Sequence, residues 1–330
     1  MPKFLVIRFS SIGDIVLTSP VVRMLKQQVP KAEVHFLTKK SFESVVVNNS
    51  FIDKVWTTDG SLKDVIPQLK AEKFDEVIDL HSNLRTWRIK QALKVKSSTF
   101  NKLNFEKWLL VNLKMNRLPA THIVNRYLKT VEHLGVQNDG EGLNFYFDDT
   151  VLSNDKLLPA TFHAGYWVAV IGANHATKRF PTNKWIEVIK QLNFPVVIVG
   201  DKNDAVVASE IENDCGDIVY NACGKYSLLQ SAAIVSQAKM VITNDTGMMH
   251  IASSYNRNII SVWGNTVPAF GMTPYMPENY SNSIIVEAKN VNCRPCSKIG
   301  FAKCPTGHFD CMNKIDLNEI TVAANRFLNK

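Results

Sequence analysis

The sequence predicts an α/β protein built from two doubly wound parallel sheets. Short apolar runs alternate with amphipathic helical patterns along the whole chain, and such strand–helix units form parallel sheets with helices on both faces. A chain of 330 residues is long enough for two domains of ordinary size. A polar stretch at 148–166 divides the alternating pattern, so the domains are predicted at 1–155 and 156–315, followed by a C-terminal helical segment at 316–330.

The first half begins with an apolar run that Arg8 interrupts, which predicts a strand rather than a signal peptide. Strands are expected at 3–9, 33–38, 54–57, 75–80 and 143–147. Helices are expected at 13–28, 41–48, 61–71, 83–94, 105–113 and 121–135.

The second half repeats this alternation. Strands are expected at 167–172, 195–200, 218–222, 240–243, 259–263 and 284–287. Helices are expected at 182–192, 203–213, 227–237, 247–254 and 316–328. Open α/β sheets bind ligands outside the carboxyl ends of their strands, so two Rossmann-like domains are expected to face a central cleft with those ends.

Composition indicates a globular protein with an anionic partner. The net charge is +8, and no apolar run approaches the ~20 residues that span a bilayer. A cytoplasmic location is therefore expected, where cysteines are more often thiols or metal ligands than disulfides. Between positions 85 and 117 a single acid, Glu106, stands among basic residues: Arg85, Arg88, Lys90, Lys94, Lys96, Lys102, Lys107, Lys114 and Arg117. This stretch suits nucleic acid, an anionic membrane or a phosphorylated lipid, or is a solvated helical face.

The stretch Asn244-Asp245-Thr246-Gly247 is the strongest local signal. It joins an apolar strand to a helix, and a helix N-terminus binds phosphate through its unpaired N–H groups. Gly247 allows close approach, whereas Asp245 and Thr246 are expected to cap the helix and hold ligand hydroxyls. His250 follows one turn later. The alternative is an ordinary N-cap with a surface histidine.

Two further loops carry candidate chemistry. Gly13 and Asp14 open a helix after the first strand, where Asp14 is either a helix-start acid or a general base. Lys178, after the strand at 167–172, either neutralises a diphosphate or belongs to a plain basic loop. The chain lacks G-x-G-x-x-G, G-x-x-x-x-G-K-[ST] and H-E-x-x-H, so dehydrogenase, P-loop and zincin interpretations lose their main support.

A cysteine cluster lies near the C-terminus with the pattern C-x₂-C-x₇-C-x₆-C. Its members are Cys293, Cys296, Cys304 and Cys311. The first pair is typical of a structural zinc site, but the second pair is spaced more widely than in a usual zinc ribbon. Structural metal, disulfides and buried thiols therefore all remain open.

Together these loops resemble the lipopolysaccharide core heptosyltransferases, glycosyltransferase family nine. The resemblance rests on Ser11-x-Gly13-Asp14, on Gly172-Ala173 followed by Lys178-Arg179, on Asn244-Asp245-Thr246-Gly247-x-x-His250, and on Gly264-x-Thr266. It implies a GT-B enzyme that transfers L-glycero-D-manno-heptose from ADP-heptose with inversion. The implied acceptor is the Kdo or heptose of the inner core, on a phosphorylated lipid A–Kdo molecule at the inner membrane surface.

The resemblance also implies residue roles. Asp14 matches the general base and Lys178 the lysine on the donor diphosphate. The remaining donor-side positions are Thr177, Asp201, Asp204, Asp245, Thr246, Gly247 and His250. The acceptor side is expected at Ser11, Gly13, Arg85 and Arg88, with Arg85 and Arg88 assigned on charge more than on motif.

Further expectations follow from the resemblance. Catalysis needs no metal or cofactor, no nucleic acid is bound, and the protein is cytoplasmic and peripheral to the inner membrane. The helix within 316–330 packs back on the first domain. The chain departs from the family pattern at Met248, where proline is common, and at Val267, where an acid is common. Another nucleotide-sugar donor therefore stays open, as does a non-catalytic nucleotide- or nucleic-acid-binding role.

Overall fold

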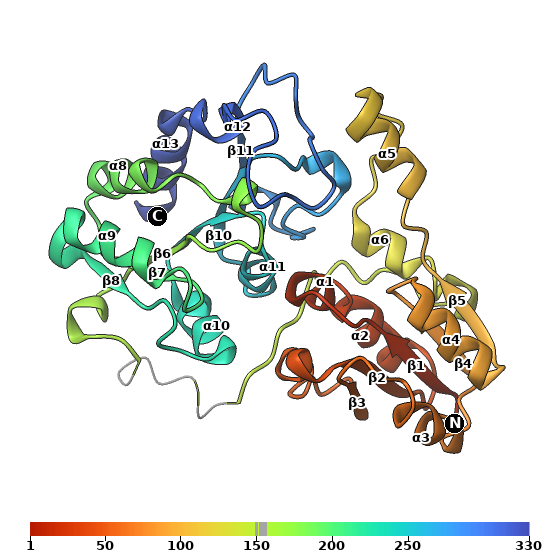
Figure 1. Ribbon diagram of the computed structural model, residues 1–330. Helices are drawn as coiled ribbons and strands as arrows, with labels where there is room; N and C mark the ends of the chain where they lie inside the picture. Colours follow the sequence, from red (N-terminus) through yellow and green to blue (C-terminus); the bar gives the residue numbers. More distant parts are fainter. Residues whose placement is uncertain (149–150, 152–156, 330) are drawn as a thin grey trace. The chain divides into compact units, whose positions relative to one another are not determined.

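The computed structural model describes residues 1–148, 151 and 157–329, which form two compact units (Figure 1). The first unit comprises residues 1–103 and 121–147, and the second comprises residues 104–120 and 148–330. The predicted boundary after residue 155 lies outside the described residues. Residues 104–120, which the sequence analysis placed within the first domain, group with the second unit.

The first unit is a five-stranded parallel sheet with the strand order β3-β2-β1-β4-β5. In that order the strands are Lys54–Thr58, Glu33–Lys39, Lys3–Ile7, Glu76–Asp79 and Lys96–Thr99. Its helices are α1 (Ile12–Val16), α2 (Ser19–Gln28), α3 (Val65–Ala71), α4 (Leu84–Leu93) and α6 (Ile123–Leu128), with 3₁₀ turns at Lys40–Val45 and Glu132–Leu134. Leu69 of α3 and Ile89 of α4 share one core with Leu5 and Val77 of the sheet.

The second unit is a six-stranded parallel sheet with the strand order β11-β10-β9-β6-β7-β8. In that order the strands are Ser283–Glu287, Asn258–Trp263, Met240–Asn244, Trp167–Val170, Val196–Val199 and Val219–Asn221. The helices are α5 (Asn104–Leu113), α8 (Thr182–Leu192), α9 (Ala205–Cys215), α10 (Leu228–Gln237), α11 (Gly247–Ser254), α12 (Asp310–Asn313) and α13 (Leu317–Leu328). Short 3₁₀ helices are Ala160–Phe162, Ala176–Lys178, Gly216–Ile218, Pro268–Phe270 and Tyr280–Asn282.

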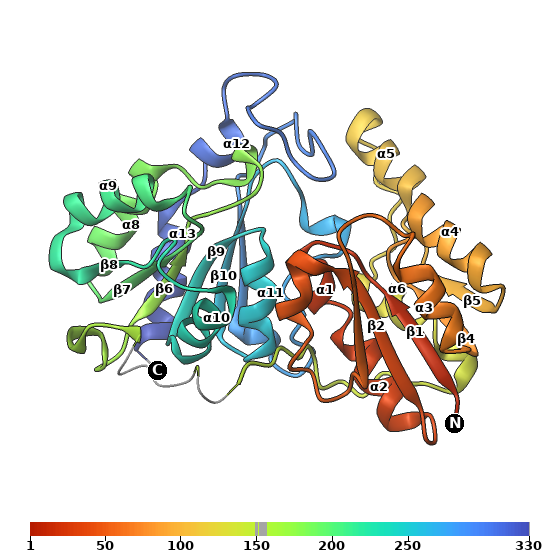
Figure 2. The same ribbon diagram turned by 60° about the horizontal axis from the view of Figure 1, so that its bottom comes forward.

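Helices cover both faces of the second sheet (Figure 1 and Figure 2). One core contains residues of α8, α9 and α13, and the other contains residues of α10 and α11. Helix α8 shows why these segments are helical, since its buried side chains recur with helical spacing at Trp185, Val188, Ile189 and Leu192. Asn193, in the left-handed conformation, ends it. The doubly wound arrangement predicted from the alternating pattern is therefore confirmed.

The C-terminal helix α13 buries its apolar face in the core of the second unit. Ile320, Ala324 and Phe327 belong to the same cluster as Trp185 of α8 and Ile260 of β10. This packing follows from amphipathicity, since α13 presents one apolar stripe and the second sheet accepts it. The expected return of the C-terminal helix to the first domain stays a prediction.

The predicted helix at 13–28 is divided in two. Helix α1 ends at Val16, and α2 begins at Ser19 with Pro20 in its first turn. Proline lacks a backbone N–H, so it is tolerated at the start of a helix but breaks the interior. The break gives α1 its own short first turn, which carries Asp14.

The predicted strand at 143–147 does not form. The Asn144 N–H donates to Ser19 Oγ instead of to a neighbouring strand, and the Asn144 side chain accepts a hydrogen bond from Arg23. In turn, β5 was not predicted, since Lys96-Ser-Ser-Thr99 has no apolar alternation. As an edge strand beside β4 it can remain polar and exposed.

None of the helices in the described ranges has the length and hydropathy needed to cross a bilayer.

Candidate active site

Asp14 is held at the carboxyl edge of the first sheet by the turn between β1 and α1. Its Oδ2 accepts hydrogen bonds from the backbone N–H of Ser11 at 3.1 Å and from Ser11 Oγ at 2.7 Å. Its Oδ1 lies 2.5 Å from Nη2 of Arg8. The side chain is nevertheless 21% exposed. A fixed carboxylate that solvent reaches can accept a proton from a bound hydroxyl.

Arg8 is the positioning residue that the sequence analysis missed. Its guanidinium is almost buried, donates to the carbonyls of Ser10 and Leu80, and lies about 6 Å from the ring centroids of Phe100 and Tyr127. In the sequence it only interrupts an apolar strand. A buried arginine needs a partner, so a charged residue at the end of a buried strand was the available signal.

A basic hollow of about 430 Å³ lies at the carboxyl edge of the same sheet. It brings together Arg85 and Arg88 of α4, both predicted for the acceptor side. It adds Lys39 at the end of β2 and His81 after β4, which were not predicted. Ser10 and Asn83 complete the polar lining. Of the other predicted acceptor residues, Ser11 binds Asp14 and Gly13 is buried within α1.

His81 is neutral in this hollow. Burial, together with the nearby charges of Arg8 and Lys102, lowers its pKa from 6.5 to about 4. Its ring packs edge-on against Phe9 with the centroids 5.1 Å apart. The positive charge of the hollow at neutral pH therefore comes from Lys39, Arg85 and Arg88 and not from His81.

In the second unit, Lys178, Asp245 and Thr266 form one network from three loops. Lys178 Nζ lies 2.5 Å from Asp245 Oδ2, and Thr266 Oγ1 donates to the same oxygen at 2.8 Å. These loops follow β6, β9 and β10, which are neighbours in the sheet. The network places an ammonium group and a carboxylate at the carboxyl edge, where open α/β sheets bind ligands.

Helix α11 begins beside this network without a side-chain cap. Thr246 is its N-cap residue, and its side chain accepts no hydrogen bond from the first turn. The expectation that Asp245 and Thr246 cap the helix is therefore wrong, because the Asp245 carboxylate is engaged by Lys178 and Thr266. The turn of Thr246 and Gly247 keeps the features of an anion site. His250 is buried one turn further on, so it is not a surface histidine.

Thr177 and Asp204 are buried and hold loops. Thr177 Oγ1 accepts from the N–H of Phe301 at 2.8 Å and also contacts the Phe301 carbonyl. The Asp204 carboxylate accepts from the Asp201 N–H at 3.0 Å and packs so closely on Gly172 that a Cβ there would lie 2.2 Å from its Oδ2. Burial raises the pKa of Asp204. Asp201, by contrast, is exposed.

Arg294, within the cysteine cluster, is a second positioning residue that the sequence analysis missed. Its side chain is 8% exposed and donates to the carbonyls of Gly264 at 2.5 Å, Thr266 at 2.9 Å and Ala288 at 3.2 Å. It also pairs with Glu287 at 2.9 Å. Arg294 thus fixes the loop that carries Thr266. The role of Arg294 was not evident from the sequence, because it stands inside a C-x₂-C motif whose spacing indicates metal or disulfide chemistry of the cysteines.

The cysteine cluster consists of free thiols. All four cysteines lie in described residues, and no three of their sulfurs come within 4.8 Å of one another. Sulfurs bound at about 2.3 Å from one zinc ion would lie about 3.8 Å apart, so these thiols are not gathered as closely as a bound ion would hold them, and a structural metal here stays a prediction. Burial raises the pKa of Cys296 to about 11 and that of Cys311 to about 12.

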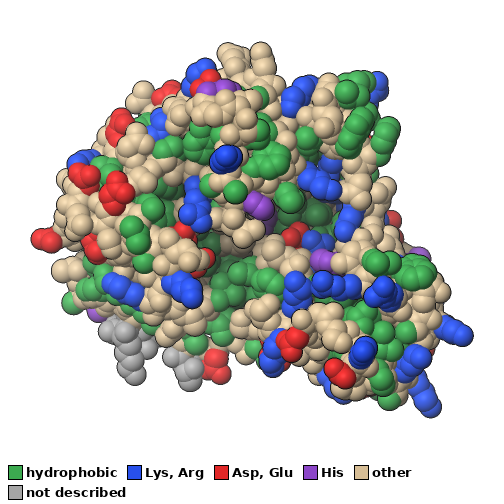
Figure 3. Space-filling view, in the orientation of Figure 1, with side chains coloured by type: hydrophobic (Ala, Val, Ile, Leu, Met, Phe, Trp, Pro, Cys, Tyr) green, Lys and Arg blue, Asp and Glu red, His purple; other side chains and the backbone are tan. Residues whose placement is uncertain are grey.

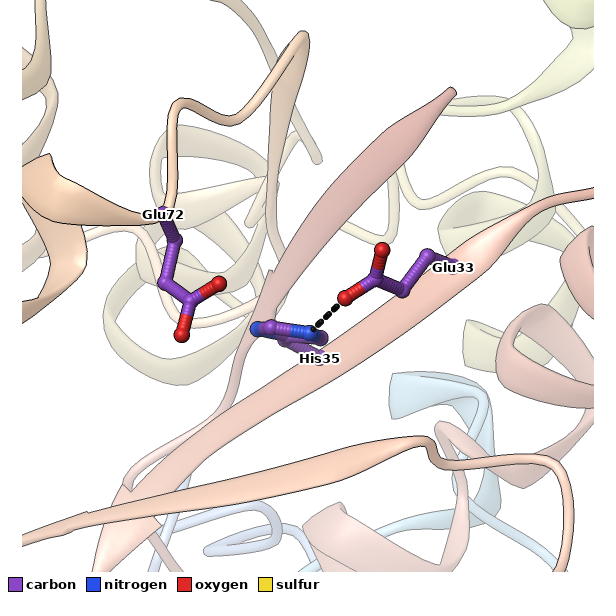
Figure 4. A group of neighbouring side chains, drawn as sticks. All are labelled: Glu33, His35 and Glu72. Carbon is purple, nitrogen blue, oxygen red and sulfur yellow. Dashed lines mark hydrogen bonds and ion pairs between the residues drawn. The ribbon is translucent and has the colours of Figure 1, made fainter. Parts of the chain in front are cut away.

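Glu33, His35 and Glu72 lie together at the opposite edge of the first sheet, near the strand starts (Figure 4). Within the described ranges they are the one group of potential metal ligands whose atoms gather within 4.8 Å. Lys3 Nζ already lies 3.0 Å from Glu33 and 2.9 Å from Glu72. His35 Nδ1 accepts from Trp56 Nε1, so Nε2 carries the proton that it donates to Glu33. The cluster is therefore an ion-pair network in which an ammonium group takes the place of a metal.

Comparison with known proteins identifies the family. The sequence profile of glycosyltransferase family 9 (heptosyltransferase) matches residues 63–303. Lipopolysaccharide heptosyltransferase 1 of Campylobacter coli is 23% identical over 294 residues, which cover 80% of this chain and 84% of that protein. The crystal structure of a family 9 glycosyl transferase from Veillonella parvula superimposes with a TM-score of 0.80 at 21% identity, covering 99% of this chain and 97% of the other.

The ADP-heptose lps heptosyltransferase II of Escherichia coli superimposes with a TM-score of 0.74 at 18% identity, covering 99% of this chain and 98% of the other. The structural likenesses confirm the predicted GT-B fold, with two parallel-sheet α/β domains. The profile spans most of the sequence, including the loops that carry Lys178, Asp245 and Thr266. The chain therefore belongs to glycosyltransferase family 9, the heptosyltransferase family.

Proposed function

We propose that this enzyme transfers L-glycero-D-manno-heptose from ADP-heptose to the Kdo or heptose of the lipopolysaccharide inner core, with inversion. The observation that carries the proposal is the network of Lys178, Asp245 and Thr266 at the uncapped start of α11. It supplies an ammonium group and a helix N-terminus, the two features that stabilise a departing diphosphate. The relatives named above as lipopolysaccharide heptosyltransferases support this choice of substrate.

In the proposed reaction an acceptor hydroxyl attacks the anomeric carbon opposite the ADP group. Asp14 takes the hydroxyl proton as the new C–O bond forms and the bond to the diphosphate oxygen breaks. General base catalysis of this kind contributes about 10²–10⁴ in rate. Arg8 holds Oδ1 of Asp14 and Ser11 holds Oδ2, so the carboxylate is oriented before the acceptor arrives.

The second unit would bind the donor. Lys178, Thr246 and Gly247 contact the diphosphate, and Asp245 and His250 complete the loop at the sugar. Asp201, which is exposed, is the better candidate for the ribose hydroxyls, whereas buried Asp204 and Thr177 position the loops. No metal is assigned to catalysis, since Lys178 supplies the positive charge.

The basic hollow would bind the acceptor. Lys39, Arg85 and Arg88 offer charge and hydrogen-bond donors for the phosphate and carboxylate groups of a lipid A–Kdo molecule. The protein would accordingly work in the cytoplasm, peripheral to the inner membrane. Nucleic acid is not a proposed partner, because the family's activity accounts for the basic charge.

Thermal shifts with ADP, UDP and GDP in EDTA test the donor first. A ligand at about 100 times its Kd adds about 2.7 kcal/mol of stability, so selective stabilisation by ADP is measurable. Transfer of heptose from ADP-heptose to a Kdo-bearing acceptor, still in EDTA, would then establish the reaction. Preference for UDP or GDP would favour another nucleotide-sugar donor, in keeping with the departures from the family pattern at Met248 and Val267. Absence of transfer from ADP-heptose would overturn the proposal.

A further inference from the structure

We propose that α5, together with the turn at 298–303, forms a docking surface for an anionic lipid bilayer. The inference rests on the proposed function for its purpose, because a lipid-linked acceptor must be reached at a membrane. Its test needs neither donor nor acceptor, so the two proposals can fail separately.

The first observation is an apolar stripe on α5 that faces solvent. Phe105 is 67% exposed, Trp108 is 52% exposed and Leu113 is 53% exposed, whereas Leu110 is buried. On a helix, positions 105, 108 and 113 fall within an arc of about 140°, and Leu110 lies outside this arc, beyond Leu113. Figure 3 shows hydrophobic side chains gathered over α5 with Lys and Arg side chains beside them. Exposed aromatic residues on a single helical face are unusual in a globular surface and mark an interaction site.

The second observation is an apolar turn elsewhere in the same unit. Ile299 is 56% exposed and Phe301 is 40% exposed. Two exposed lysines lie close to them in sequence, since Lys298 directly precedes Ile299 and Lys303 stands two positions after Phe301. The sequence holds no acid from 288 to 309. Lys114, just after α5, ties this helix to the segment that leads into the turn, since its Nζ donates to the carbonyls of Cys293 at 3.0 Å and Pro295 at 2.8 Å.

Charge selects an anionic bilayer as the occupant. Residues 104–120 carry Lys107, Lys114 and Arg117 against Glu106 alone. Each basic residue near an anionic membrane surface strengthens binding by about fivefold, and Trp and Phe prefer the headgroup boundary. A helix with an apolar aromatic face and basic flanks lies in the interface plane of a membrane. An acidic protein partner would pair with the same basic residues. It would not supply the apolar environment that the exposed Phe105 and Trp108 need.

Flotation with lipid vesicles tests this surface on the full chain. The vesicles are phosphatidylcholine alone, or phosphatidylcholine and phosphatidylglycerol in equal parts. We expect binding to the mixed vesicles that weakens with added salt. The double variant Phe105→Ser/Trp108→Ser should reduce partitioning at least about tenfold, since two large apolar side chains no longer enter the interface. The matched control is Val206→Ser/Val322→Ser, which removes exposed apolar side chains from α9 and α13.

Several outcomes would overturn the proposal. These are equal binding to both kinds of vesicle, absence of binding by the natural chain, or equal loss in the two double variants. Dimers that dissociate in Phe105→Ser/Trp108→Ser would assign the face to a second copy of the chain instead. Melting temperatures confirm that each variant is folded, and transfer to a soluble Kdo acceptor should continue in Phe105→Ser/Trp108→Ser, because α5 carries no residue assigned to the reaction.

Discussion

Lys178 Nζ and Asp245 Oδ2 lie 2.5 Å apart, although 67 residues separate them in sequence. The pair exists because β6 and β9 are adjacent and parallel, so the loops after them meet at one edge. Thr266, after β10, donates to the same oxygen and fixes its position. Asp245 therefore fixes the position of the Lys178 ammonium group, and Thr266 fixes the position of the Asp245 carboxylate. Electrostatic catalysis requires charges that are preorganised in this way.

Replacement of Lys178 by alanine should weaken donor binding and slow transfer. Loss of one preorganised charge or donor typically lowers the rate by about 10²–10³. Lys190→Ala is the matched control, since Lys190 is exposed and pairs with Asp214 on the surface. Titration calorimetry with ADP and a transfer assay measure the two effects. Donor affinity and rate equal to those of Lys190→Ala would remove Lys178 from the site.

Asp14→Asn should abolish most turnover while donor affinity is unchanged. The amide keeps the size of the side chain but cannot accept the proton, so we expect a loss of about 10²–10⁴ in kcat. ADP affinity should persist, because the residues proposed to bind the donor belong to the other unit. Asp59→Asn, an exposed acid of the first unit, serves as the control. Asp14→Asn with normal kcat would show that another group takes the proton.

The sequence was informative wherever periodicity and loop position carry the information. Alternating apolar runs located most of the strands of the two sheets, and the loops after β6 and β9 indicated Lys178 and Asp245. Prediction from the sequence failed where tertiary contacts determine the local structure. Residues 143–147 have a strand pattern, but the Asn144 N–H donates to Ser19 and the Asn144 side chain accepts from Arg23.

The supporting residues were also missed for a physical reason. Arg8 and Arg294 act through backbone carbonyls of distant segments, Leu80 in one case and Gly264 and Thr266 in the other. No local spacing in the sequence records such pairs. The sequence also gives no local indication that Lys39 belongs to the basic hollow, since only the order of the strands in the sheet brings the end of β2 near α4.

Arg294→Ala should destabilise the second unit and weaken donor binding together. Four carbonyls lose their donor, and an unsatisfied buried polar group costs about 1–3 kcal/mol. We expect the free energy of unfolding in urea to fall by about 2–4 kcal/mol, allowing for partial hydration. Lys289→Ala, nearby but exposed, should change it by less than about 0.5 kcal/mol. Equal effects of the two substitutions would mean that Arg294 does not hold the Thr266 loop.

Acid should weaken the first unit through His81. In the folded protein the pKa of His81 is lowered to about 4, against 6.5 for an ordinary histidine, because the side chain is buried near Arg8 and Lys102. Between these values the unfolded chain binds the proton more readily, so stability is complete above pH 6.5 and declines as the pH falls toward 4. His81→Asn should show a shallower decline of melting temperature over this window, whereas His308→Asn, exposed in the second unit, should follow the natural chain. Parallel curves for His81→Asn and the natural chain would show that acid sensitivity arises from other groups.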